Sequence, residues 1–354
     1  MSGSNQGTGK TIENINLFDD GIQCRFIKST WGAFTKVKVK SFFKKDTVTR
    51  TSFIGRKNPQ NSLALYLCNW GDELKVSGTT KILGDLKLPN GRFKKSSILG
   101  NSQLNRPVIS GLITSSNQSL PEILIESNPL PERTTQIKLS KIKTNQQIFN
   151  DFESPTLLVD VAKTERITNF NLKGNILLKS NDTIYIESSS RLEDVIISAP
   201  KVVIQNGFQG SIQVFADKEI VIDSNVILTY PSALFIFSKT NEFSKNITIS
   251  KNAQIYGGIV LGGASFDQRE ANTIVIKKGA LIVGDIYCNG KLELQGKVLG
   301  TVLSHKLNLE TKNGSYENTL LNAEINASDR PKGALSPFLS FKNEESNYNV
   351  IKNL

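Results

Sequence analysis

Short runs in which aliphatic residues alternate with other residues dominate the chain, and glycine, asparagine, aspartate and serine separate one run from the next. This pattern is typical of many short β-strands. Only residues 137–152 have some helical periodicity. The pattern therefore predicts an all-β protein.

Within this pattern, six tripeptides place two aliphatic residues around a third residue. They are Ile184–Ile186, Val202–Ile204, Ile220–Ile222, Ile247–Ile249, Ile274–Ile276 and Leu292–Leu294. Their last residues are 18, 18, 27, 27 and 18 positions apart, and the two longer intervals contain polar or glycine-rich insertions at 238–245 and 262–272. A second set of triplets lies between them, at Val195–Ile197, Ile212–Val214, Leu234–Ile236 and Ile259–Leu261.

An interval of 18 residues accommodates three short strands with tight corners, and stacked coils pair each strand with the one above it in parallel. We therefore predict a right-handed parallel β-helix with short coils of about 18 residues over residues 165–310. The alternative, a β-sandwich, does not require strands to recur at a fixed interval of 18 residues. Corners need positive φ, so we expect glycines there. The candidates are Gly174, Gly210, Gly257, Gly284, Gly290, Gly296 and Gly300.

The remaining chain divides into four further regions. We predict a flexible tail at 1–11, a strand-rich N-terminal cap at 12–72, early coils with a long polar insertion at 73–164, and a C-terminal cap or tail at 311–354. The segment Ile82–Leu88 has the same form as Ile282–Cys288, with two aliphatic residues, Gly-Asp and a further aliphatic residue. Residues 74–88 are therefore expected to form an early or capping coil of the same stack.

The charge of the chain lies mostly at one end. The net charge is +11, and residues 1–100 carry 17 Lys or Arg against 7 Asp or Glu. We predict a basic, partner-facing patch that could meet anionic lipid or an acidic polysaccharide. It consists of Lys36, Lys38, Lys40, Lys44 and Lys45. Alternatively, these lysines form the solvated face of a strand, because they alternate with valines; nucleic acid is not favoured, because no recognition motif accompanies the charge.

The residues that usually carry chemistry are few and dispersed. Cys24, Cys68, Cys288 and the single histidine, His305, form no ligand cluster, and we predict buried thiols, with one bridge such as Cys24–Cys68 left open. The GTGK sequence at 7–10 departs from the phosphate-loop pattern and follows no strand. No apolar run approaches the roughly 20 residues that span a bilayer, and no cleavable signal opens the chain, so we expect a soluble chain.

The predicted stacking allows a test for catalytic carboxylates. Neighbouring coils align Glu187 with five residues in turn: Gln205, Asp223, Ser250, Lys277 and Gln295. Glycosidases need two carboxylates close together, and this line holds no adjacent pair. We therefore predict no enzymatic activity, no catalytic residues, no cofactor and no metal. The aromatic residues of the coils are expected to fill the core, although outward rings would suit a sugar.

Residues 174–303 resemble the bactofilins, a family of polymer-forming bacterial proteins. The Gly-Asp and Gly-Thr corners with flanking aliphatic residues carry this resemblance, at Leu281–Ile286 and Lys297–Val302. The insertions, the N-terminal region and the C-terminal tail are not bactofilin-like, and the whole chain looks like poorly characterised envelope proteins of bacteria. The resemblance implies a β-helix that polymerises and a location in the cell envelope, periplasmic or membrane-associated, with the cytoplasm as the alternative.

The function predicted from these observations is that of a non-enzymatic structural or assembly protein. Its partners would be copies of itself or envelope proteins, and its end coils would pair through their strand edges. The residues expected to mediate self-association lie near the end of the repeat. They are Ile282, Ile286, Leu292, Leu294, Val298 and Val302. The alternatives are a β-helix that binds or cleaves polysaccharide and an adhesin or fibre module.

Overall fold

A computed structural model describes most of the chain. The described residues are 11–16, 21–56, 62–98, 106–123, 134–237, 244–263, 269, 271–331 and 348–354. The predicted tail at 1–11 lies outside these residues, except for Thr11, which begins the first strand. The protein is all-β, as predicted, and the two helical segments among the described residues are the short 3-10 turns η1 (Pro89–Gly91) and η2 (Leu139–Lys141).

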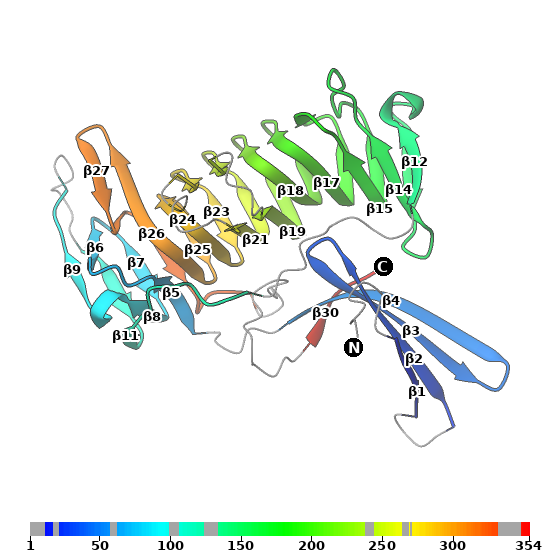
Figure 1. The fold of residues 1–354 in the computed structure, drawn as a ribbon, viewed down its shortest axis with the longest axis horizontal. Helices are drawn as coiled ribbons and strands as arrows, with labels where there is room; N and C mark the ends of the chain where they lie inside the picture. The colour runs from blue at the N-terminus through cyan, green and yellow to red at the C-terminus, as the bar shows by residue number, and fades with distance from the viewer. Residues whose placement is uncertain are drawn as a thin grey trace, which may run out of the picture.

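The strands form a rod of stacked coils with a smaller sheet beside it (Figure 1). The strands of the sheet are β1 (Thr11–Ile15), β2 (Gln23–Trp31), β3 (Phe34–Phe43), β4 (Asp46–Arg56) and β30 (Tyr348–Asn353). The strands of the rod are β5 (Leu63–Leu67), β6 (Leu74–Ser77), β7 (Lys81–Leu83), β8 (Asp85–Leu88), β9 (Phe93–Lys95), β10 (Val108–Ser110), β11 (Ile113–Ser115), β12 (Thr134–Lys138), β13 (Gln147–Asn150), β14 (Thr156–Asp160), β15 (Asn171–Lys179), β16 (Ile184–Ile186), β17 (Arg191–Ile204), β18 (Gln209–Ile222), β19 (Ile227–Phe237), β20 (Asn246–Ile249), β21 (Gln254–Gly262), β22 (Thr273–Ile276), β23 (Leu281–Val283), β24 (Ile286–Leu294), β25 (Lys297–Leu299), β26 (Val302–Thr311), β27 (Gly314–Glu317), β28 (Thr319–Leu321) and β29 (Glu324–Asn326).

Parallel pairing joins the coils into three ladders along the rod. Ladder A runs β13–β15–β17–β18–β19–β21–β23–β25–β29–β7–β10. Ladder B runs β12–β14–β15–β17–β18–β19–β21–β24–β26–β5–β8–β11. Ladder C runs β16–β17–β18–β20–β22–β24–β26 and resumes as β28–β6–β9. The long strands turn a corner and serve two ladders each.

The register confirms the intervals read from the sequence. In ladder C, Ile186 pairs with Ile204, 18 residues on, and Ile222 pairs with Ile249, 27 residues on. All six triplets pair in succession, and their outer residues are almost fully buried. Files of aliphatic side chains therefore fill the interior, and each coil buries its core against its neighbours. The all-β class and the parallel pairing are confirmed, and the right-handed parallel β-helix remains a prediction.

The order of coils along the rod differs from their order in the chain. Strands β5 to β11 do not precede the repeat but stack on its far end, where Val302 pairs with Leu65 and Ile325 pairs with Ile82 (Figure 1). The first coil of the rod begins instead at β12. The capping coil expected at 74–88 is therefore present, but it caps the C-terminal end of the repeat. The two similar Gly-Asp segments lie at the same corner, between ladders A and B.

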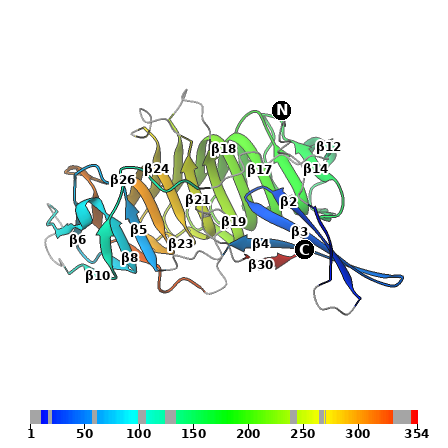
Figure 2. The ribbon, with the colours of Figure 1, turned by 60° about the horizontal axis from the view of Figure 1, so that its bottom comes forward.

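The region predicted as a strand-rich cap at 12–72 does not cover an end of the rod. Strands β1 to β4 form an antiparallel sheet that lies along the side of the rod, and β5 already belongs to the rod (Figure 2). The predicted tail at 311–354 also divides, because β27 forms an antiparallel hairpin with β26, β28 and β29 continue the rod, and β30 pairs with β4 at the edge of the sheet. The region predicted at 73–164 as early coils with a long polar insertion contributes described strands at both rod ends.

The predicted corner glycines serve two purposes. Gly284 has φ +151°, and a Cβ atom there would lie 1.8 Å from the backbone oxygen of Gly257 in the next coil. Gly210 does not have positive φ, and a Cβ atom there would meet the Leu192 oxygen and the Phe208 ring, which fills the core at this level. The expectation of positive φ was therefore wrong for Gly210, and also for Gly290 and Gly296, where close packing of backbone excludes a side chain.

Candidate functional site

The six residues predicted to mediate self-association lie inside the stack. Their exposed fractions are 0–2%, and all except Leu294 have paired neighbours on both sides within an aliphatic file. In ladder A, Ile282 lies between Ile255 and Val298, and in ladder B, Val302 lies between Ile286 and Leu65. The repeat pattern predicted an open end here, because the return of β5 to β11 onto this end leaves no trace in the repeat interval.

The described ends of the rod lie elsewhere, at β12 and β13 on one side and at β9, β10 and β11 on the other. At both ends the aliphatic files stop with side chains that are only partly buried against the core. They are Ile137 and Ile148 at the first end and Phe93, Ile109 and Ile113 at the second. Further apolar side chains are exposed beside them, namely Phe149 at 61%, Val108 at 48% and Leu112 at 67%.

The antiparallel sheet is fixed to the rod by the turn between β2 and β3. Trp31, Phe34 and Phe53 are buried against outward-facing residues of ladder B, and the rings of Trp31 and Phe53 stack with centroids 5.0 Å apart. The Trp31 indole donates a hydrogen bond to Asn175 at 3.0 Å, and the Ala33 amide donates to Gln213 at 2.6 Å. The polar groups at this contact are therefore paired as well as buried.

The predicted basic patch separates into two groups. Lys36, Lys38 and Lys40 alternate along β3 as expected, but Lys36 donates to the Phe152 carbonyl and Lys38 forms an ion pair with Glu153. Burial lowers the pKa of Lys36. These two lysines help to hold the sheet on the rod. Lys44 and Lys45 instead form the exposed turn between β3 and β4, far from the rod.

A second charged contact joins the last strand to the rod. The Lys352 ammonium lies 2.6 Å from Asp194 and 3.2 Å from Glu193. Burial alone raises the pKa of Glu193, but hydrogen bonds and charge from Lys173 and Lys352 outweigh it and leave this pKa below 4.5. Burial alone lowers the pKa of Lys352, but Asp194 and Glu193 outweigh it and leave this pKa above 10.5.

This contact predicts a pH dependence of sheet docking. Because the pKa of Glu193 is lowered in the folded state, its contribution is present above pH 4.5 and is lost as the pH falls through the lowered value. We expect Trp31 fluorescence to report release of the sheet in acid. A Glu193→Gln variant has no charge to lose there and should show a weaker acid transition. Identical acid transitions in both proteins would contradict this role.

The polar residues that were predicted to lie next to one another on neighbouring coils, from Glu187 to Gln295, do so in the structure. Backbone hydrogen bonds follow the register from Glu187 through Gln205, Asp223 and onward to Gln295. Glu187 pairs with Arg166 at 2.7 Å. Sequence reasoning missed the corner aspartates between ladders A and B, where Asp194 binds Lys352 and Asp285 binds Arg330. Both cations come from chain segments beyond residue 326, which no local pattern links to these corners.

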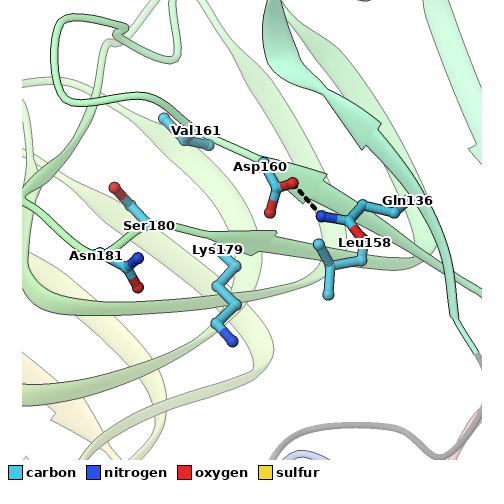
Figure 3. A pocket seen from close by; sticks show the side chains of 7 residues that line it. All are labelled: Gln136, Leu158, Asp160, Val161, Lys179, Ser180 and Asn181. Atoms are coloured by element: carbon cyan, nitrogen blue, oxygen red, sulfur yellow. Dashed lines mark hydrogen bonds between the residues drawn. The ribbon is translucent and has the colours of Figure 1, made fainter.

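A cavity of about 430 Å³ lies near the β12 end of the rod (Figure 3). Its lining residues are Gln136, Leu158, Asp160, Val161, Lys179, Ser180 and Asn181. The Gln136 amide donates a hydrogen bond to Asp160, and Asp160 is the one carboxylate among these residues. Such a lining can hold a polar molecule, but glycoside hydrolysis requires a second carboxylate nearby.

The remaining residues of interest are packed. The three cysteines are free and buried, as predicted, and burial raises the pKa of the Cys68 and Cys288 thiols to about 12. His305 is buried, and its ring packs edge to face with the Trp70 ring, with centroids 5.4 Å apart. Within the described ranges no group of His, Cys, Asp or Glu is placed to hold a metal ion. No helix in the described part of the chain is long and apolar enough to cross a membrane.

Comparison with known proteins gives no relative. No family model, no curated protein and no solved structure matches this chain.

Proposed function

We propose that this chain is a non-enzymatic structural protein whose rod, a right-handed parallel β-helix, associates end to end. One observation carries the proposal: the aliphatic files run along the rod and stop at both ends with partly buried side chains beside strand edges that pair with no further strand among the described residues. All strands of a ladder are parallel, so a second copy that adds β12 to β11 would continue ladder B and its core.

This contact would be heterologous, because it joins two different ends, and repetition would produce an open filament. Lysines are exposed at both ends, with Lys94 and Lys95 in β9 and Lys138 in β12. Like charges at an edge oppose pairing, so association should increase as salt screens them. Such a filament accords with the bactofilin resemblance and with a place in the bacterial cell envelope, which are part of the same proposal.

Sedimentation velocity and electron microscopy at about 0.02 M and about 0.5 M salt test this proposal. We expect larger assemblies at the higher salt concentration, and we expect Ile109→Lys or Ile148→Lys to abolish them by placing a charge at one end of a file. Thr248→Lys, on the outer side of ladder C in mid-rod, is the matched control and should assemble normally. A strict monomer at all salt and protein concentrations would exclude the proposal.

A further inference from the structure

The antiparallel sheet has two faces of different character. Pairing places Trp31, Phe34, Lys36 and Lys38 on the face that meets the rod. The opposite face, here called the outer face, carries eight apolar residues. Of these, Phe43, Val48, Tyr348 and Val350 are exposed, and Phe26, Val37, Val39 and Ile54 are partly buried.

The exposure of these side chains is large for apolar residues. Val48 is 69% exposed, Val350 is 59% exposed and Phe43 is 44% exposed. These side chains share one face of a sheet with the four partly buried apolar residues, and exposed apolar side chains gathered on one face mark a site of interaction. The β3–β4 end of the sheet extends away from the rod in both views, so this surface is accessible from outside (Figures 1 and 2).

The charge around this surface is mostly positive. Among the described side chains, four Lys or Arg and one acidic residue, Asp46, lie on the outer face or in the turn at its end. Lys28 and Arg50 belong to the outer face, and Lys44 and Lys45 form the turn at its end. The Lys44 ammonium lies 5.2 Å from the Phe43 ring and the Lys28 ammonium 5.1 Å from the Tyr348 ring, so apolar and cationic groups are interleaved.

We propose that the outer face binds an anionic lipid surface. Aliphatic and aromatic side chains would enter the boundary between headgroups and acyl chains, while the lysines contact lipid phosphates. The charge argues against a second copy as the occupant, because two outer faces would bring like charges together. The site is separate from the rod ends, so lipid binding and end-to-end assembly can succeed or fail independently.

Vesicle flotation with the full chain tests this inference. We expect binding to phosphatidylcholine vesicles that contain about 30 mol% phosphatidylglycerol, weakening at about 0.5 M salt, and little binding to phosphatidylcholine alone. The apolar variant Val48→Asp and the charge variant Lys44→Glu/Lys45→Glu should each lower the apparent affinity roughly tenfold or more. A Val48→Trp variant should show a blue shift of its emission when anionic vesicles are added.

Matched controls lie on the rod. Lys251→Glu/Lys278→Glu changes the same amount of charge at exposed corners, and Leu112→Asp introduces a charge at an exposed apolar residue of a rod end. Both should bind vesicles like the unmodified protein. Absence of binding, equal binding to neutral vesicles or full binding by Val48→Asp would overturn the inference. Binding of duplex DNA that is lost in Lys44→Glu/Lys45→Glu, without binding of vesicles, would assign the face to nucleic acid instead.

Discussion

Replacing Leu65 by alanine is expected to lower the free energy of unfolding by about 3 kcal/mol and to loosen coils that are more than 200 residues away in the chain. Leu65 is fully buried in ladder B, between Val302 and Leu86. Its truncation leaves a cavity between the returning segment and the last coils of the repeat. Because each coil is stabilised by its neighbours, the damage should remain local.

Hydrogen exchange measures where this loss occurs. Amides of residues 63–88 and 302–326 should exchange faster in the Leu65→Ala variant, while those of 171–222 should keep their protection. Leu178→Ala is the matched control, since Leu178 is equally buried in the same ladder near the other end. It should loosen 157–197 and leave 302–326 unchanged. Unaltered exchange at 302–326 in Leu65→Ala would mean that 63–116 does not close this end.

Local regularity made most of the rod predictable. An inward aliphatic residue must recur wherever a coil passes the core, so Ile186, Ile204 and Ile222 could be aligned from their spacing alone. The same logic correctly aligned Glu187 with Gln205 and Asp223. Because strands at a fixed interval pair in parallel with one another, sequence distance converts into spatial neighbourhood, and the prediction succeeds for that reason.

The closure of the rod could not be predicted in this way. Val302 and Leu65 are 237 positions apart, and their pairing follows from no interval in the repeat. The similar segments around Gly84 and Gly284 indicated a shared corner but not its place in the stack. The roles of Lys36 and Lys38 also depended on a distant partner, because Phe152 and Glu153 approach them only in the folded protein. Alternation gave the correct strand, but it predicted that the lysines form the solvated face, whereas Lys36 and Lys38 face the rod.

The buried ion pair between Asp285 and Arg330 should be the most sensitive polar contact of the rod. The Asp285 side chain is fully buried, and its two oxygens accept from the Arg330 guanidinium at 2.8 and 2.9 Å. It also accepts from the Thr301 amide at 2.9 Å. Asp285→Ala would leave a cation and an amide buried without this partner, so we expect a loss of about 3–5 kcal/mol in thermal or urea unfolding.

Two further variants separate the cost of an unpaired charge from the value of the pair itself. Asp285→Leu/Arg330→Met removes both charges, and it should recover much of the stability lost in Asp285→Ala, because burying two ions costs about as much as their attraction returns. Glu324→Gln breaks the partly exposed pair with Lys297 at 2.9 Å and should change stability by about 1 kcal/mol or less. If Asp285→Ala costs no more than Glu324→Gln, then Arg330 does not anchor the segment after β29 to this corner.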